Sequence, residues 1–288
     1  MRDWLTAAER RLRAARLHFG HGAHNARDEA AWLLAHVLRL SHEDLARSAN
    51  RELTVPEQRK ALRLIDERVR TRKPLAYLIH EAWLGDYRFY VDERVLVPRS
   101  FVAELLRDRL KPWTSGPVIR ALDLCTGSGC LAILLALAFP RAAVDASDIS
   151  RAALAVARKN ISAYGLGRRI RLVRADLLSG LKRKQYDLIV ANPPYVGGAA
   201  MRRLPPEYRR EPRLALAAGA DGLAFVRRIL TSAAEHLRPG GLLVVEVGHS
   251  RSRVERAFPR VPFIWPETSA GDDCVFLAYR DDLYNSRQ

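Results

Sequence analysis

A regular alternation of short apolar segments with helix-like segments, which begins at residue 118, constrains the fold most. Apolar segments joined through helices form βαβ units, so this pattern predicts a mostly parallel sheet covered by helices. The predicted strands are 118–124, 142–146, 170–174, 187–191, 242–247 and 274–278, and the predicted helices are 131–138, 152–164 and 222–237, the last of them ended by Pro239-Gly240-Gly241. The C-terminal part is therefore predicted to be an α/β domain.

The N-terminal part differs, because its apolar residues recur at helical spacing. Helices are predicted over Trp4–Leu17 and Asp28–Leu40, Ser41 is a candidate cap for a short following helix, and Pro56 fits the first position of another. In that last helix one apolar stripe is predicted, made of Leu62, Ile65 and Val69. We therefore expect a small helical domain over residues 1–80.

A connecting region is predicted between the two parts. Residues 83–97 alternate around a Gly-Asp dipeptide and carry aromatic side chains, which is typical of a β-hairpin. Residues 111–117, Lys-Pro-Trp-Thr-Ser-Gly-Pro, then break all periodicity. We therefore expect a hairpin and linker helix over 81–112 and the α/β domain over 113–288.

The charge of the chain limits its partners. Lysine and arginine outnumber aspartate and glutamate by 48 to 32, which gives a formal net charge of +16, and 42 of the 48 are arginine. Such an excess favours a polyanionic neighbour such as RNA. A general bias of composition toward arginine explains it equally well.

The apolar and cysteine patterns limit the compartment. The longest apolar run, Cys130–Phe139, is far shorter than the roughly 20 residues that span a bilayer. The start of the chain, Met1–Arg16, is charged and amphipathic and does not resemble a signal peptide. The three cysteines include no Cys-x-x-Cys pair, so neither disulfides nor a metal site are predicted. We expect a cytoplasmic protein with no membrane partner, and the oligomeric state stays open.

A glycine turn follows the first predicted strand. Its residues, Asp-Leu-Cys-Thr-Gly-Ser-Gly at 123–129, lie where an open α/β sheet binds a nucleotide-like ligand. The second strand ends near Asp145–Asp148, about 20 residues on, where a carboxylate usually holds ribose hydroxyls. The third strand leads to Asp176, which can accept a hydrogen bond from an adenine amino group. A tight structural turn with surface aspartates is the alternative explanation.

Two classes of cofactor compete for this turn. A dinucleotide carries a pyrophosphate that is bound by Gly-x-Gly-x-x-Gly, which this turn lacks, and a carboxylate at Asp123 would repel phosphate. No lysine follows the glycines, so the pattern of a phosphate-binding loop is missing too. S-adenosylmethionine carries an ammonium and a sulfonium, and Asp123 complements that charge. Transfer from a sulfonium needs no nucleophile, so Cys125 is interpreted as a packing residue.

The tetrapeptide Asn192-Pro193-Pro194-Tyr195 follows the fourth predicted strand, so it lies at the carboxyl edge of the sheet beside the cofactor. Two prolines fix an extended backbone. The Asn192 side-chain oxygen and the Pro193 carbonyl can then accept both hydrogens of a planar –NH2 group, on which Tyr195 stacks. This arrangement aligns the nitrogen lone pair with the donor methyl and stabilises the charge that develops on nitrogen. N-methylation of an amide or an exocyclic amine is predicted.

Together these motifs resemble the protein glutamine N5-methyltransferases. The shared segments are 123–129, 192–195 and Val-Leu-Val-Pro-Arg at 95–99. The resemblance covers almost the whole chain. It implies a Rossmann-like class I S-adenosylmethionine-dependent methyltransferase sheet, with a small helical N-terminal domain that binds the substrate. The family methylates glutamine side-chain amides of translation proteins: one branch acts on peptide-chain release factors, and the other on the third protein of the large ribosomal subunit.

Local sequence favours the ribosomal-protein branch. Residues 98–104 read Pro-Arg-Ser-Phe-Val-Ala-Glu, similar to the Pro-Arg-Ser-Pro-Ile-Ala-Glu of that branch, whereas the release-factor branch typically reads Pro-Arg-Pro-Asp-Thr-Glu. The resemblance implies that Asn192, Pro193, Pro194 and Tyr195 hold the substrate amide. It also implies a set of cofactor-binding residues: Asp123, Cys125, Thr126, Gly127, Gly129, Asp148, Ile149, Asp176, Leu177 and Asn192.

Two further groups of residues have competing explanations. His18, His21 and His24 have ligand-like spacing, but glycines interrupt any common helical face, so a loop between helices is predicted. Five arginines follow the tetrapeptide, at 202, 203, 209, 210 and 213. They either bind RNA phosphates around the substrate or pair with Glu207 and Glu211 in a solvated loop.

Three functions compete on these grounds. The first is methylation of a glutamine in a ribosomal protein, with S-adenosylmethionine as donor. A chain of this charge would be repelled by a free basic ribosomal protein and attracted to one that carries RNA, so an RNA-containing assembly intermediate is the expected substrate. The second is N-methylation of an amino group of a nucleic-acid base. The third, a non-catalytic RNA-binding factor, is disfavoured by the intact turn and tetrapeptide.

Overall fold

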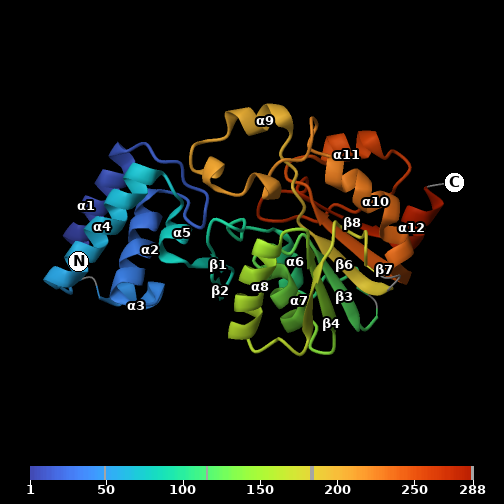
Figure 1. Ribbon diagram of the computed structural model, residues 1–288, viewed down its shortest axis with the longest axis horizontal. Coiled ribbons are helices and arrows are strands. Elements are labelled where there is room, and N and C mark those ends of the chain that lie inside the picture. Colours follow the sequence, from blue (N-terminus) through green and yellow to red (C-terminus); the bar gives the residue numbers. More distant parts are fainter. Residues whose placement is uncertain (49, 115, 182–184, 287–288) are drawn as a thin grey trace.

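The computed structural model describes residues 1–48, 50–114, 116–181 and 185–286. Figure 1 shows two parts side by side: a group of N-terminal helices, and a sheet with helices on both faces. The N-terminus lies at the outer end of the helical part, and the C-terminus lies at the opposite end of the molecule. The α/β and helical parts predicted from the sequence are both present.

The N-terminal part folds into helices, and two of the predicted start signals each lie at the beginning of one of them. They are α1 (Arg2–Ala14), α2 (Ala26–Leu38), α3 (His42–Arg47), α4 (Val55–Thr71) and α5 (Leu75–Ile79). The Ser41 hydroxyl accepts a hydrogen bond from the backbone N–H of Asp44 at 3.0 Å, which confirms the predicted cap of α3. Pro56 lies in the first turn of α4, one residue after the first helical position that was predicted for it.

The face of α4 that turns to the core differs from the predicted stripe. Ile65 is buried, but Leu62 is 40% exposed, and its neighbour Ala61 is buried instead. Arg68 explains the difference, because its side chain is buried and forms an ion pair with Glu29 at 2.7 Å. The hydrophobic pattern treats an arginine as solvent-facing, so the prediction was wrong at Leu62.

The predicted hairpin is confirmed as β1 (Ala82–Leu84) paired with β2 (Tyr87–Phe89), but it ends earlier than expected. The backbone of Tyr90 exchanges hydrogen bonds of 2.8 and 3.0 Å with the side chain of Asn160, in place of a strand partner. The expected break at 111–117 includes residue 115, which lies outside the described residues. The connecting region contributes to both cores: Val91, Val95 and Val97 pack with the N-terminal helices, whereas Leu84, Phe89 and α6 (Val102–Arg107) pack against the sheet.

The large sheet has the strand order β5-β4-β3-β6-β7-β8. Its strands are β3 (Arg120–Leu124), β4 (Ala143–Asp148), β5 (Ile170–Arg174), β6 (Tyr186–Ala191), β7 (Leu237–Glu246) and β8 (Val275–Tyr279). Neighbouring strands are parallel except β8, which is antiparallel to β7. From β3 the chain adds β4 and then β5 on one side, and β6 then pairs with β3 on its other side. The strand order therefore reverses between β3 and β6, where such sheets bind ligands.

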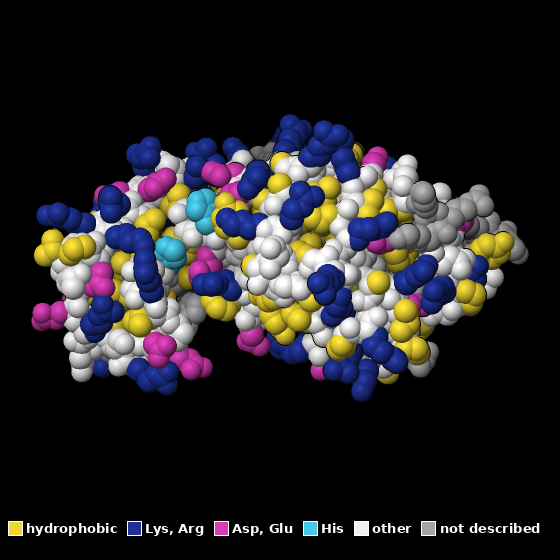
Figure 2. Space-filling view, turned by 60° about the horizontal axis from the view of Figure 1, so that its bottom comes forward, with side chains coloured by type: hydrophobic (Ala, Val, Ile, Leu, Met, Phe, Trp, Pro, Cys, Tyr) yellow, Lys and Arg dark blue, Asp and Glu magenta, His cyan; other side chains and the backbone are white. Residues whose placement is uncertain are grey.

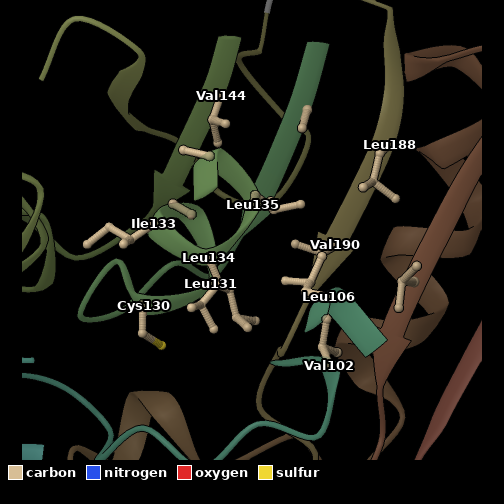
Figure 3. Close-up of a cluster of buried hydrophobic side chains, with 14 of the residues drawn as sticks. Val102, Leu106, Cys130, Leu131, Ile133, Leu134, Leu135, Val144, Leu188 and Val190 are labelled. Carbon is tan, nitrogen blue, oxygen red and sulfur yellow. The ribbon is translucent and has the colours of Figure 1, made fainter. Parts of the chain in front are cut away.

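Helices cover both faces of the sheet because side chains alternate along each buried strand. On one face, Leu188 and Val190 pack with α6, α7 (Cys130–Ala138) and α8 (Arg151–Ala163), as Figure 3 shows for α6 and α7. On the other, Ile189 and Ala191 pack with α10 (Ala224–His236), α11 (Arg251–Ala257) and α12 (Arg280–Asn285). The predicted helix at 222–237 is confirmed in its main part, although its Pro-Gly-Gly terminator belongs to the start of β7.

A long loop connects β6 to α10 and passes over the junction of the two parts (Figure 1). It contains α9 (Gly198–Arg203) and two short 3-10 turns, η1 (Tyr208–Arg210) and η2 (Arg213–Ala215). Among the described residues, every helix is too short or too polar to cross a membrane.

Candidate active site

The carboxyl ends of β3, β4 and β6 border a cavity of about 290 Å³. This cavity brings together nine of the residues predicted from the sequence: Cys125, Thr126, Gly127, Asp148, Ile149, Asp176, Leu177, Asn192 and Pro194. The other four predicted residues, Asp123, Gly129, Pro193 and Tyr195, are not among the lining residues, although each lies within two positions of one in the chain. The cavity therefore lies at the switch point of the sheet.

The turn after β3 depends on positive backbone φ angles. Cys125, Gly127 and Gly129 have φ values of 58°, 54° and 81°, a region that glycine adopts without strain. A Cβ at Gly129 would lie 3.1 Å from the Cβ of Ala157 on α8, so this glycine permits close packing of the turn against the helix. Burial raises the pKa of the Cys125 thiol, which keeps it neutral and favours its interpretation as a packing residue.

Asp123 supports the turn from behind. Its side chain is buried, and one carboxylate oxygen accepts a hydrogen bond from the Thr126 hydroxyl at 2.5 Å. Burial raises the pKa of Asp123 to about 7. Asp123 therefore supports the shape of the turn and is not itself a lining residue of the cavity.

Asp148 connects the end of β4 to the same turn. Its two oxygens accept hydrogen bonds from the backbone N–H groups of Gly127 at 3.0 Å and Ser150 at 2.8 Å. Each carboxylate oxygen can accept a second hydrogen bond, so both can also receive ligand hydroxyls. Burial raises the pKa of this carboxyl. The next residue, Ile149, lines the cavity and is 45% exposed.

Asp176 and Leu177 line the cavity from the end of β5. The Asp176 carboxylate accepts a hydrogen bond from the guanidinium of Arg228 on α10 at 2.7 Å, and Leu177 has a positive φ of 54°. Phe225, also on α10, lines the cavity as well. Arg228 and Phe225 were not predicted from the sequence, because nothing in local spacing indicates that α10 approaches the end of β5.

The tetrapeptide lies at the end of β6, as predicted. Asn192 and Pro194 line the cavity, and Pro193 is buried. The side chain of Asn192 forms no hydrogen bond with any residue that the structure describes, so its amide oxygen is available to a ligand. Asn192 and the turn therefore face the same cavity from two adjacent strands.

The hydroxyl of Tyr195 is hydrogen-bonded to a carboxylate, Glu246, that was not predicted from the sequence. Its hydroxyl donates a hydrogen bond to Glu246, at the end of β7, at 3.4 Å. Its ring packs against Gly248, where a Cβ would lie 2.9 Å from Cε2 of the ring. Burial raises the pKa of Tyr195 and raises that of Glu246 to about 7. A carboxylate at the end of an apolar strand was the only sequence signal for this role.

Arg99 and Ser100 form another part of the cavity wall. The Arg99 guanidinium donates two hydrogen bonds of 2.6 Å to the Glu211 carboxylate, which also accepts the backbone N–H of Val97 at 3.1 Å. Although Glu211 is buried, the positive charge of Arg99 holds its pKa at about 2. The loop after the tetrapeptide is thereby fixed to the segment that precedes α6.

The pairing expected for Glu207 and Glu211 in a solvated loop is wrong. Both glutamates are buried; Glu207 pairs with Arg72 of the helical part at 2.7 Å, and Glu211 pairs with Arg99. The alternative partners, Arg202, Arg203, Arg209, Arg210 and Arg213, are exposed, and within the described ranges none of them forms an ion pair. Glu207 therefore joins the loop to the N-terminal helices, and Glu211 joins it to the segment that precedes α6.

The three N-terminal histidines lie in the predicted loop between α1 and α2. His21 is buried against the ring of Tyr208, with centroids 4.2 Å apart, and its Nε2 lies 3.5 Å from the Glu211 carboxylate. Burial lowers the pKa of His21. In the part of the chain that the structure describes, His249, Asp273 and Cys274 are the one group of three His, Cys, Asp or Glu side chains with ligand atoms close enough to share an ion.

The strand order, the glycine turn and the cavity at the switch point define a class I methyltransferase fold. The profile of the Methyltransferase small domain matches residues 102–204, and that of the PrmC N-terminal domain matches residues 3–79. Two solved structures support the fold. The hMettl16 catalytic domain in complex with an RNA hairpin has a TM-score of 0.51 at 18% identity, covering 78% of this chain and 81% of that one. A methyltransferase from Pyrococcus furiosus has a TM-score of 0.50 at 17% identity, covering 77% and 98%.

Relatives with much higher identity define the family. A ribosomal protein uL3 glutamine methyltransferase from Neisseria meningitidis is 51% identical over 98% of this chain and 94% of its own length. One from Bordetella pertussis is 50% identical over 98% and 96%. The chain belongs to the ribosomal protein uL3 glutamine methyltransferases, which confirms the resemblance inferred from its motifs.

Proposed function

We propose that this protein methylates the side-chain amide nitrogen of a glutamine in ribosomal protein uL3, with S-adenosylmethionine as the methyl donor, in the cytoplasm. The observation that carries the proposal is the position of Asn192. Its amide lines the same cavity as the glycine turn, and it has no hydrogen-bond partner among the described residues. An unengaged acceptor beside a nucleotide-type turn suits the capture of a planar –NH2 group.

The residues around the cavity fit S-adenosylmethionine. Asp148 has acceptor capacity left for ribose hydroxyls, Asp176 offers an acceptor for an adenine amino group, and the backbone of the turn at 125–128 is accessible to a ligand. When bound, the donor would supply an electrophilic methyl group on a sulfonium. The turn at 123–129 lacks the Gly-x-Gly-x-x-Gly pattern that binds the pyrophosphate of a dinucleotide.

The chain's own residues would orient the substrate amide. The Asn192 side-chain oxygen and the Pro193 carbonyl accept its two N–H bonds, and the rigid backbone of two prolines keeps these acceptors in place. Accepting both hydrogens makes the nitrogen lone pair available and stabilises the positive charge that develops on nitrogen. Because the proton can leave after transfer, no general base is required, and Tyr195 shields the amide from water.

Kinetics of an Asn192 variant test this role. Asn192→Ala removes an aligning acceptor, so the turnover number for uL3 should fall by more than about tenfold while the Kd of the donor changes far less. Asn25→Ala is a matched control, because Asn25 caps α2 by accepting the N–H of Asp28 at 2.9 Å. It should lower stability and leave the turnover number at saturating uL3 unchanged, since Asn25 does not line the cavity. Normal turnover by Asn192→Ala would exclude the proposed role.

We also propose that the helical domain over 1–80 recognises the substrate, and that the substrate carries RNA. The five exposed arginines of the loop after the tetrapeptide have no carboxylate partner among the described residues and follow the site directly in sequence. Figure 2 shows that lysine and arginine side chains are spread over the visible face of both parts. Unpaired guanidinium groups beside the site suit RNA phosphates around the glutamine.

Comparison of two substrates tests the RNA contribution. uL3 bound to its ribosomal RNA fragment should be methylated faster than free uL3 at low salt, and the advantage should shrink as salt rises. Replacing Arg209, Arg210 and Arg213 by glutamine should remove most of the advantage. Replacing Arg158 and Arg168, which are exposed near the opposite edge of the sheet, should not. Equal rates on both substrates at every salt concentration would exclude an RNA contribution.

A further inference from the structure

Two buried carboxylates hold one segment of the cavity wall. Residues 97–101 directly precede α6, and Pro98, Arg99 and Ser100 line the cavity. Glu211 accepts hydrogen bonds from the first half of this segment. Glu246 accepts from the second half: the Ser100 hydroxyl donates to its Oε2 at 2.6 Å, and the backbone N–H of Phe101 donates to the same oxygen at 2.9 Å. The segment is therefore fixed at both ends.

Glu246 also reaches the tetrapeptide. It ends β7, where its neighbour Val245 pairs with Ala191 of β6, so Glu246 stands one residue farther along, level with Asn192. Its Oε1 accepts the hydroxyl of Tyr195 at 3.4 Å. One carboxylate thus joins the cavity wall before α6 to the last residue of the tetrapeptide.

The partners of Glu246 match an ionised carboxylate. All three are donors, two hydroxyls and one backbone amide, and a carboxylate is an acceptor at both oxygens. Glu246 is buried, and burying an ionised carboxylate costs free energy that its hydrogen bonds offset only in part. A task that an apolar residue could not perform would explain why a carboxylate is found here. A glutamine of the same shape would keep one acceptor and present a donor to the remaining partners.

We propose that Glu246 is a positioning residue for methyl transfer: it fixes Tyr195 and the wall segment 98–101 relative to each other, so that the amide held at Asn192 is sandwiched in one orientation. This proposal rests on the proposed function, because it assigns Glu246 a role through the tetrapeptide. Glu246 touches neither the substrate nor the donor. Its loss should therefore slow the chemical step and leave binding of the donor nearly unchanged.

A double-mutant cycle tests the proposal, measured at pH 8, where a carboxyl with a pKa of about 7 is ionised. Glu246→Gln should lower the turnover number for uL3 by about tenfold or more, while the Kd of S-adenosylmethionine changes by less than about threefold. Tyr195→Phe removes the hydroxyl that Glu246 holds. If Glu246 acts through Tyr195, the double variant should be no slower than Glu246→Gln alone.

Glu211→Gln is the matched control, since Glu211 is also a buried carboxylate that accepts hydrogen bonds from the segment 97–101 but, among the described residues, forms none with Tyr195. Its effect should multiply with that of Tyr195→Phe. If Glu246→Gln does not fold, Ser100→Ala and Tyr195→Phe form a second cycle through the same carboxylate. If the wild type is active and Glu246→Gln has normal turnover, the proposal is wrong. It is also wrong if the effect of Tyr195→Phe multiplies with that of Glu246→Gln and with that of Ser100→Ala. Inactive wild type would instead count against the proposed function.

Discussion

The backbone N–H of Gly127 donates a hydrogen bond to the carboxylate of Asp148 at 3.0 Å, so the end of β4 holds the glycine turn that follows β3. The other oxygen of the same carboxylate accepts the N–H of Ser150 at the start of α8. One side chain therefore sets the relative position of three segments that border the cavity.

Asp148→Ala should weaken binding of the methyl donor by about tenfold or more, because it removes both the support of the turn and an acceptor for hydroxyls. Titration calorimetry with S-adenosylmethionine measures the change. Asp187→Ala is a matched control: Asp187 also accepts two backbone N–H groups, from Ile119 and Arg120, but near the amino end of β6. If both variants bind the donor as the wild type does, Asp148 has no part in the cofactor site.

Gly222→Ala should displace the tetrapeptide. A Cβ at Gly222 would lie 2.5 Å from the carbonyl oxygen of Tyr195, and its φ is +84°. Gly165→Ala is the control for backbone strain alone. Gly165 also has a positive φ, of +66°, but an added Cβ there would meet open space. Gly165→Ala should cost about 1 kcal/mol of stability with normal turnover. Gly222→Ala should cost more and lower turnover more than about tenfold, measured by urea denaturation and methylation assays. Equal losses of stability and of turnover in the two variants would show that the added Cβ at Gly222 does not collide with Tyr195.

Asp123 should make stability depend on pH. Its pKa is raised from 3.8 to about 7 by burial, so the folded state keeps a proton that the unfolded state releases above about pH 4. The contribution of Asp123 to the free energy of unfolding is therefore present at pH 4 and is lost as the pH rises to 7. A shift of this size corresponds to a few kcal/mol.

Asp123→Asn cannot titrate and isolates this effect. Denaturation of both proteins between pH 4 and pH 8 gives the difference in free energy of unfolding, wild type minus variant. That difference should fall as the pH rises and become level above about pH 7. A difference that is constant over the whole range would show that Asp123 is ionised in the folded protein.

Arg68→Ala should destabilise the helical domain strongly. The buried guanidinium pairs with Glu29 at 2.7 Å and donates to the carbonyl of His18 at 3.2 Å. Its removal leaves a buried carboxylate without its partner, which costs about 3–5 kcal/mol. Arg47→Ala breaks an exposed pair with Asp44 and should cost less than about 1 kcal/mol. Thermal denaturation of the two variants compares them, and similar losses would contradict a structural role for Arg68.

Much of the α/β domain could be predicted because its information is local. Buried parallel strands are continuous apolar runs, and the glycine turn and the tetrapeptide each follow such a run directly in sequence. Because parallel strands end at one edge of a sheet, their order along the chain is enough to predict that Asn192 and Gly127 share a site, and both line the cavity.

The missed residues depend on contacts between distant segments. Glu211 lies 112 residues from Arg99, and Glu246 lies 146 residues from Ser100, so no spacing rule connects them. Arg68 was missed for a different reason, since burial of its charge depends on a partner from another helix. Local pattern therefore identified the chemistry, whereas the residues that position it needed the tertiary structure.

Tandem mass spectrometry of uL3 after incubation with the enzyme and S-adenosylmethionine decides whether a glutamine is methylated. We expect the mass of one added methyl group on the side chain of a single glutamine of uL3, and we expect it to be lost when Asn192→Ala replaces the wild type. Methyl groups found only on RNA, or an equally labelled glutamine with the Asn192 variant, would contradict the proposed function.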